Sequence, residues 1–155
     1  MKTLSFLVKI LPAQTAYAHC DIPCGIYDPT PMQIAAHTVL RMTQLLSEKT
    51  EVHDVARIAY VKEEHGGRVE NELGTLENDY FKSEHFEKFP ELKDLIADAV
   101  KLSAETRQHI DLEKAQTLLE KVLLISEIFY KTKNVTPVRV SSLYPTKGEI
   151  VTYTA

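Results

Sequence analysis

The sequence predicts an all-α protein: an up-and-down four-helix bundle with an amino-terminal hook before it and an extra extended carboxy-terminal tail after it. Two observations point to this fold class. Apolar residues recur at helical spacing in four segments joined by short links, which is typical of a bundle. The chain also has only five glycines and no tryptophan, a composition that argues against a turn-rich all-β fold.

The first helix is expected over residues 31–47. Thr30 and Gln33 have the spacing of a capping box, and Pro31 takes the first helical position, where its missing N–H costs nothing. The apolar stripe that follows consists of Met32, Ala35, Val39, Met42 and Leu46. This spacing places the stripe on one face of the helix, toward a core.

A second helical stretch is expected over residues 51–80, and its apolar face begins with Val52, Val55 and Ala59. The pair Gly66–Gly67 lies inside this stretch. A glycine in a helix interior costs about 1 kcal/mol relative to alanine. We therefore expect a kink or local fraying at the pair.

Two further helices are expected to begin at Pro90 and at Asp111. Their stripes are Leu92, Leu95, Ile96, Ala99 and Leu102 in the third helix, and Leu112, Ala115, Leu118, Leu119, Val122, Ile125 and Phe129 in the fourth. The bundle then occupies residues 31–134. Residues 135–155 form the tail, where β-branched residues, prolines and a glycine favour extended structure or a hairpin around Thr146–Gly148. A disordered end is the alternative.

Length and charge limit the classes of function. At 155 residues, the chain is long enough for one domain with a hydrophobic core and too short for two comfortable ones. The net charge of −4 provides no basic surface for nucleic acid. No stretch approaches the roughly 20 apolar residues of a membrane span. We therefore expect neither a nucleic-acid partner nor a membrane span.

Residues 1–18 are interpreted as a leader that a processing protease removes. Lys2, a short apolar run and the small-x-small ending at Ala16–Ala18 are typical of a secretory signal. Lys9 interrupts the apolar run, so the residues leave open whether the leader exports the protein or only protects it. Its removal would leave 16 basic and 22 acidic residues, a net charge of −6.

The two cysteines of the chain, Cys20 and Cys24, follow this leader directly. Cleavage before His19 would create a free α-amine beside an imidazole, an amide nitrogen and a thiolate. With the second thiolate, these groups offer two nitrogens and two sulfurs in one plane, and the imidazole as an axial ligand. Such a donor set favours nickel or copper over tetrahedral zinc. A local disulfide or two unremarkable thiols is the alternative from the residues alone.

Two sequence blocks carry a family resemblance. The block HCDIPCGIYDP at residues 19–29 resembles the nickel-binding hook of nickel-containing superoxide dismutases nearly residue for residue. The block DYFKSEHFEKFPEL at residues 79–92 also looks like that family, and the resemblance covers roughly residues 19–133.

The resemblance implies an activity and an assembly. It implies an antioxidant oxidoreductase that converts superoxide to oxygen and hydrogen peroxide through a Ni(II)/Ni(III) centre. The hook of residues 19–30 would hold one nickel ion per subunit through His19, Cys20 and Cys24. Family members are right-handed four-helix bundles that assemble as homohexamers, and removal of a leader exposes the histidine.

The resemblance also assigns roles around the metal. Tyr27 and Tyr80 would line the approach of superoxide and hold ordered water, and Asp21 would bond to backbone amides of the hook. Lys82 and Lys88 are candidates for a local positive potential. Packing aromatics and solvated lysines are the structural alternatives.

One departure from the family concerns the orientation of the axial imidazole. An acidic residue and an arginine often hold it in the family, but the corresponding positions are Ala35 and His65 here. We expect His65 to substitute as a direct or water-mediated partner of His19. The other histidines are interpreted as surface or packing residues: His37, His53, His85 and His109.

Two other classes of function remain from the sequence alone. A nickel or copper binding and delivery protein would also use an amino-terminal His-Cys chelate. A module with a structural Cys20–Cys24 bridge would fit an exported protein. We expect a cytoplasmic product, with export as the alternative because the leader is signal-like.

Overall fold

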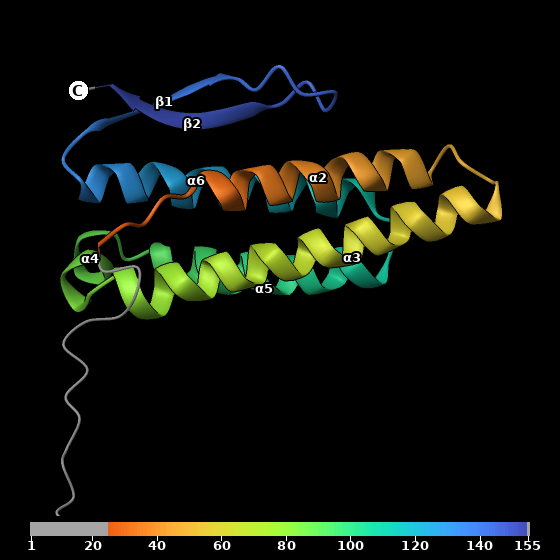
Figure 1. Ribbon diagram of the computed structural model, residues 1–155. Helices are drawn as coiled ribbons and strands as arrows, with labels where there is room; N and C mark the ends of the chain where they lie inside the picture. The colour runs from red at the N-terminus through yellow and green to blue at the C-terminus, as the bar shows by residue number, and fades with distance from the viewer. Residues whose placement is uncertain (1–24, 155) are drawn as a thin grey trace, which may run out of the picture.

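The computed structural model of the chain describes residues 25–154. The four long helices are α2 (Thr30–Leu46), α3 (Val52–Thr75), α5 (Leu92–Gln108) and α6 (Leu112–Thr132). Each packs against two of the others, because α2 and α5 both contact α3 and α6. Figure 1 shows them as two layers, with α2 beside α6 and α3 beside α5. The predicted all-α four-helix bundle is therefore confirmed.

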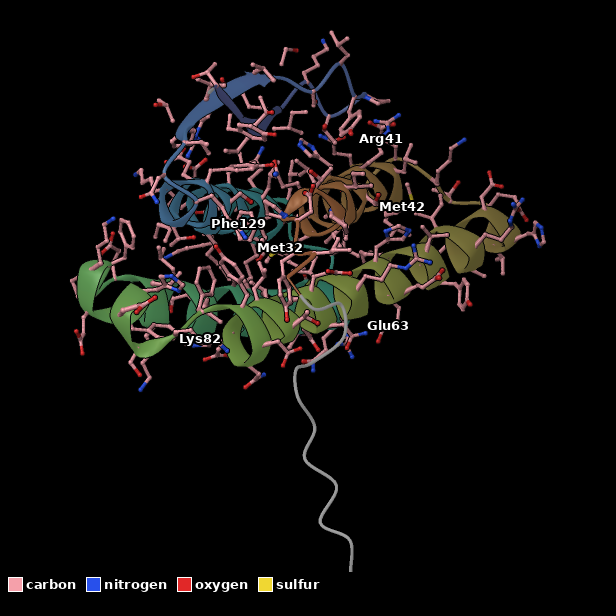
Figure 2. All side chains as sticks on the ribbon, turned by 60° about the vertical axis from the view of Figure 1, so that its left-hand side comes forward. Met32, Arg41, Met42, Glu63, Lys82 and Phe129 are labelled. Carbon is pink, nitrogen blue, oxygen red and sulfur yellow. The ribbon has the colours of Figure 1, made fainter. Side chains whose placement is uncertain are left out.

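The core lies between the two layers and contains much of the predicted apolar stripes. The largest fully buried side chains include Met32, Val39, Val69, Leu73, Leu92, Ile96, Leu118 and Ile125. Figure 2 shows Met32 and Phe129 between the helices, whereas Glu63 and Lys82 lie on the outside. Burial of this apolar surface is the dominant force that holds the bundle together. None of the helices within residues 25–154 is long and apolar enough to cross a membrane.

The start of α2 differs from the predicted capping box. Pro29 is the N-cap residue and no side chain caps the helix, while the backbone N–H of Thr30 donates to Oδ1 of Asp28 at 2.7 Å. Gln33 is buried, and its side-chain amide pairs with the backbone C=O and N–H of Val151 at 3.0 and 2.7 Å. The prediction is wrong because a buried tertiary contact engages the glutamine.

The glycine pair does not interrupt α3, which is helical from Val52 to Thr75. Gly66 is buried, and a Cβ at this position would lie 2.5 Å from Cγ of Arg107 on α5. The glycine therefore allows α3 and α5 to approach closely, and the expected kink is wrong. Of the predicted apolar start of the helix, Val55 and Ala59 are half-buried, but Val52 is 80% exposed.

The second helical stretch ends in a π-helical turn, η1 (Leu76–Tyr80). The backbone N–H of Phe81 closes this turn by donating to the C=O of Leu76 at 2.8 Å. Single π-turns often occur at functional sites, and this one places Tyr80. The short helix α4 (Ser83–Lys88) follows; the apolar pattern does not predict it because it contains no buried residue.

The tail forms an antiparallel hairpin of β1 (Thr136–Ser141) and β2 (Glu149–Thr154). The hairpin lies on the outer face of the α2 and α6 layer (Figure 1). Val151 of β2 is buried, and Arg139 of β1 forms an ion pair with Glu127 of α6 at 2.6 Å. Of the two alternatives for the tail, the structure has the hairpin.

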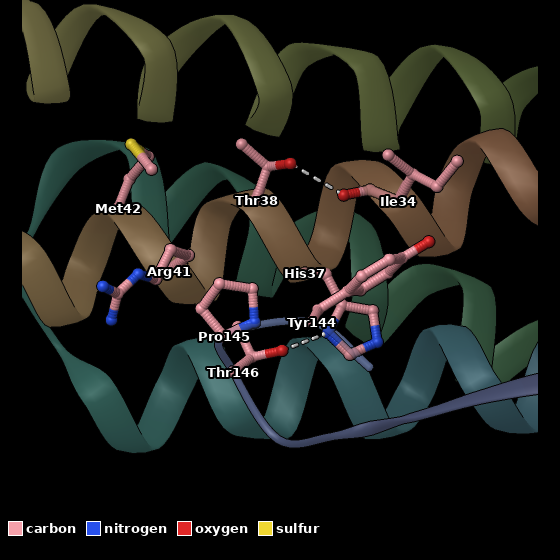
Figure 3. Close-up of a pocket in the computed structure, with 8 residues that line it drawn as sticks. All are labelled: Ile34, His37, Thr38, Arg41, Met42, Tyr144, Pro145 and Thr146. Atoms are coloured by element: carbon pink, nitrogen blue, oxygen red, sulfur yellow. Dashed lines mark hydrogen bonds between the residues drawn. The ribbon is translucent and has the colours of Figure 1, made fainter. Parts of the chain in front are cut away.

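His37 of α2 holds the hairpin tip. Its Nδ1 accepts from the hydroxyl of Thr146 at 2.9 Å (Figure 3), and its Nε2 donates to the C=O of Glu149 at 2.8 Å. A carbonyl only accepts, so these partners fit the neutral ring. Burial lowers the pKa of His37, and the hydrogen bond to Glu149 raises it by less. The net direction is downward.

This lowered pKa predicts that acid weakens the fold through His37. Well above about pH 6.5, neither the native nor the unfolded chain carries a proton on this ring. As the pH falls through that value, the unfolded chain takes up the proton first, so the free energy of unfolding decreases by up to about 1.4 kcal/mol per pH unit. Urea unfolding of the nickel-free protein between about pH 7.5 and pH 5.5 measures this loss.

His37→Gln is expected to reduce the pH dependence, since its side chain does not titrate. His53 is exposed on α3, and His53→Gln is the matched control, expected to keep the wild-type pH dependence. Equal pH dependence in wild type and His37→Gln would contradict the assignment.

Candidate functional site

The predicted nickel ligands His19, Cys20 and Cys24, and the predicted hook residue Asp21, lie outside the described residues. Within residues 25–154, no group of three or more His, Cys, Asp or Glu side chains is placed to hold a metal ion. The described residues contribute two features of the candidate site. One is the pair Tyr27 and Tyr80, of which Tyr27 follows the cysteines closely in the sequence. The other is a pocket between α2 and α3.

Tyr27 and Tyr80 lie together although they are far apart in the sequence. Their ring centroids are 5.3 Å apart and the rings are tilted by 49°. Both side chains are partly buried and pack against the core. Tyr27 follows Cys24 by three residues, so covalent geometry keeps its Cα within about 11 Å of the backbone that carries this thiol. The structure thus brings the two predicted tyrosines into one pair.

An aromatic cluster fixes the position of Tyr80. Its ring centroid lies 4.7 Å from that of Phe129, 5.2 Å from that of Phe81 and 5.7 Å from that of His85. Aromatic pairs at such distances contribute about 0.5–1.5 kcal/mol beyond the area that they bury. The cluster therefore joins η1, α4 and the end of α6 around one phenol ring.

The hydroxyl of Tyr80 has one defined partner. It lies 2.6 Å from Oγ1 of Thr132, and the hydroxyl of Thr132 in turn donates to the C=O of Phe129 at 2.6 Å. A threonine hydroxyl has a single proton. Because that proton is used on the carbonyl, Tyr80 must be the donor of the first bond. Its oxygen then presents only lone pairs to the surrounding space.

A cation that the sequence reasoning missed, Lys133, lies over the ring of Tyr80. Its Nζ lies 4.7 Å from the ring centroid of Tyr80 and 5.6 Å from that of Phe129. The predicted Lys82 donates to the C=O of Asp79 at 2.8 Å. Lys88 lies 5.5 Å from the ring of Phe89. The helical spacing of Phe129 and Lys133 was a visible signal, but nothing in the sequence links it to Tyr80.

The second feature is a pocket between the start of α2 and the middle of α3. It is lined by Pro31, Ile34, Ala35, His65, Arg68 and Glu72. Ala35 and His65, the two positions at which the chain departs from the family pattern, therefore line the same pocket.

His65 lines this pocket, and its Nδ1 is buried and has no hydrogen-bond partner among residues 25–154. A buried polar atom without a partner costs about 1–3 kcal/mol. Burial lowers the pKa of His65, the Arg68 guanidinium lowers it further, and Glu64 raises it by less. The neutral ring is thus favoured, and its buried Nδ1 lacks a partner among the described residues.

Arg68 and Glu72 are further pocket residues that the sequence reasoning missed. They follow His65 by three and seven positions, which places all three on one face of α3. This spacing was the signal that would have found them. Arg68 also forms an ion pair with Glu64 one turn earlier. An arginine and an acidic residue therefore line the pocket, although neither occupies the position expected from the family.

Comparison with known proteins identifies relatives of the chain. Residues 14–133 match the family described as nickel-containing superoxide dismutase. The nickel superoxide dismutases of Streptomyces coelicolor and Streptomyces seoulensis are each 34% identical to it over 122 residues. The aligned region covers 79% of this chain and 93% of each relative. The hairpin lies beyond the family match.

Solved structures give the same result. The native nickel superoxide dismutase structure superposes with a TM-score of 0.70 at 34% identity, covering 74% of this chain and 99% of that one. A structure with nickel ligation corresponding to the oxidised state gives a TM-score of 0.71 at 34% identity, with 75% and 99% covered.

The assignment of Tyr80 as a donor predicts the effect of Thr132→Val. This substitution removes the acceptor from a partly buried hydroxyl, so the free energy of unfolding should fall by about 1 kcal/mol. Thr117→Val is the matched control on α6, because the hydroxyl of Thr117 only donates back to the C=O of Glu113 on an exposed face. Its effect should remain within about 0.5 kcal/mol.

A double-mutant cycle with Tyr80→Phe separates the pair from local effects of the valine. Without the phenol hydroxyl, Thr132→Val should cost less than it does in the wild-type chain. Urea unfolding of the nickel-free proteins measures both costs. The same cost in both backgrounds would contradict the hydrogen bond.

Proposed function

The chain belongs to the family of nickel-containing superoxide dismutases, and on this basis we propose that His19, Cys20 and Cys24 bind the nickel ion. The enzyme converts two superoxide anions and two protons to oxygen and hydrogen peroxide. Nickel is its cofactor. No feature of residues 25–154 favours the alternative of a nickel or copper delivery protein.

The donor set fits this metal. Anionic thiolates and a backbone amide nitrogen donate more electron density than water or carboxylate does, which favours nickel in a planar site. When bound, nickel supplies the redox chemistry by alternating between Ni(II) and Ni(III). The α-amine of His19 exists only after residues 1–18 are removed. Processing of the leader by a protease is therefore part of the proposal.

Tyr27 and Tyr80 are proposed to line the approach of superoxide. The observation that carries this role is that their ring centroids lie 5.3 Å apart. Tyr27 also follows the proposed ligand Cys24 by three residues. Because Tyr80 donates its proton to Thr132, its oxygen is oriented to accept a hydrogen bond from ordered water. Water held there is a local source of the protons that the reaction consumes.

His65 is proposed as the residue that positions the imidazole of His19. The supporting observations are that His65 lines the pocket and that its buried Nδ1 has no hydrogen-bond partner among residues 25–154. Arg68 and Glu72 set the charge of the same pocket. Asp21 is proposed to bond to backbone amides of the hook, as the family resemblance implies.

The remaining proposals concern assembly and location. The family resemblance supports a homohexamer with one nickel ion per subunit. We also propose a cytoplasmic enzyme, and export is the alternative that the signal-like leader leaves open.

The decisive test compares the full chain with a chain that begins at His19. The shorter protein is expected to bind nickel and consume superoxide. The full chain should bind nickel weakly and show no activity, because residue 19 then presents an amide nitrogen in place of an amine. Metal analysis, superoxide consumption and the amino-terminal sequence of the active form measure these outcomes. An active, nickel-loaded protein that retains Met1 would refute the role of the amine.

His65→Ala is expected to lower activity per bound nickel by about 10–100-fold, the usual effect of losing a partner of a metal ligand. Nickel content should fall little, because the ligands themselves remain. His53→Ala changes an exposed histidine of the same helix and should leave both quantities unchanged. Unchanged activity in His65→Ala would show that another group holds His19.

A further inference from the structure

The end of α6 places a positive charge over the rings of Tyr80 and Phe129. Lys133 is the first residue after this helix, and its Nζ lies 4.7 Å from the ring centroid of Tyr80. The ring centroid of Tyr27 lies 5.3 Å from that of Tyr80, and Tyr27 follows the cysteines in the sequence. The ammonium group is therefore one aromatic ring away from the proposed path of the substrate.

This charge is not neutralised by an ion pair. Within residues 25–154, no carboxylate oxygen lies within 4.0 Å of Nζ of Lys133. Other lysines of the bundle have such partners, namely Lys49, Lys101, Lys114 and Lys121. The charge of Lys133 instead rests on the faces of two aromatic rings, an interaction that leaves its full positive charge in place.

A local cation matters here because the chain as a whole repels the substrate. The net charge is −4 for the full sequence, and superoxide is an anion. A positive group at the mouth of a site raises the local concentration of an anionic substrate against an unfavourable overall charge. Screening limits such an effect to about 8 Å at physiological ionic strength. Lys133 lies within this distance of Tyr80.

We propose that Lys133 steers superoxide to the Tyr27–Tyr80 pair. This proposal rests on the function proposed above. A purely structural role is the competing explanation, because a lysine at a helix C-terminus also interacts with the negative end of the helix dipole. That role affects stability, but it does not make the rate of reaction with an anion depend on salt.

The test uses three variants of the mature, nickel-loaded enzyme. Lys133→Gln removes the charge and Lys133→Arg keeps it. Lys131→Gln removes an equal, exposed charge two residues earlier on the last turn of α6, and Lys131 lies over no aromatic ring of residues 25–154. The second-order rate constant for superoxide is measured by pulse radiolysis from about 10 to 200 mM ionic strength.

At low ionic strength, Lys133→Gln is expected to lower the rate constant about two- to fivefold and to flatten its salt dependence. The difference from wild type should vanish at high ionic strength. Lys133→Arg and Lys131→Gln should follow the wild type. An unchanged salt dependence in Lys133→Gln, or an equal change in Lys131→Gln, would overturn the proposal.

A second measurement does not depend on the metal. Azide serves as a probe anion in the nickel-free mature protein, and the ring resonances of Tyr80 are followed by NMR. Azide should shift these resonances in wild type and Lys131→Gln, and much less in Lys133→Gln. Absence of a shift in wild type would overturn the proposal, whereas an inactive wild-type enzyme with a normal azide response would overturn the proposed function alone.

Discussion

The burial of α2 between α3 and α6 is the constraint on which the site depends. Met32 and Val39 of this helix are fully buried, so its axis cannot move without opening the core. Its first turn is joined directly to the segment that carries Tyr27 and, before it, the cysteines. The hydrophobic stripe that stabilises the bundle therefore also fixes where the proposed metal-binding segment leaves it. A loss of core packing would displace the site before any proposed ligand is changed.

The hairpin restrains the same helix from the outside. Gln33 pairs with the backbone of Val151, and His37 bonds to the hairpin tip. These side chains project from α2 away from its apolar face, so the helix is held on two sides by different forces. The hydrogen bonds are directional, and a buried amide left without its partner is costly. The family match ends at residue 133, so the hairpin side of this second restraint lies beyond the matched region.

The sequence was sufficient for the helices because their apolar stripes repeat with the period of an α-helix. It was insufficient where a tertiary contact overrides a local rule. Gln33 is buried and does not complete a capping box, and Gly66 leaves room for Arg107 and does not produce a kink. Helix α4 was not predicted because it has no buried residue and therefore no apolar stripe in the sequence. For Gln33 and Gly66 the deciding partner lies on another element of the fold.

The same distinction holds for the site. Tyr27 and Tyr80 were predictable through the family resemblance, but their surroundings were not. Thr132 and Lys133 act on Tyr80 only because the end of α6 lies against η1, and no local pattern encodes that approach. The two residues act on different parts of Tyr80. Thr132 orients the proton of its hydroxyl, and Lys133 places a positive charge over its ring. A phenol held in this way keeps its orientation while anions enter and leave, which suits a site whose substrate is small and charged.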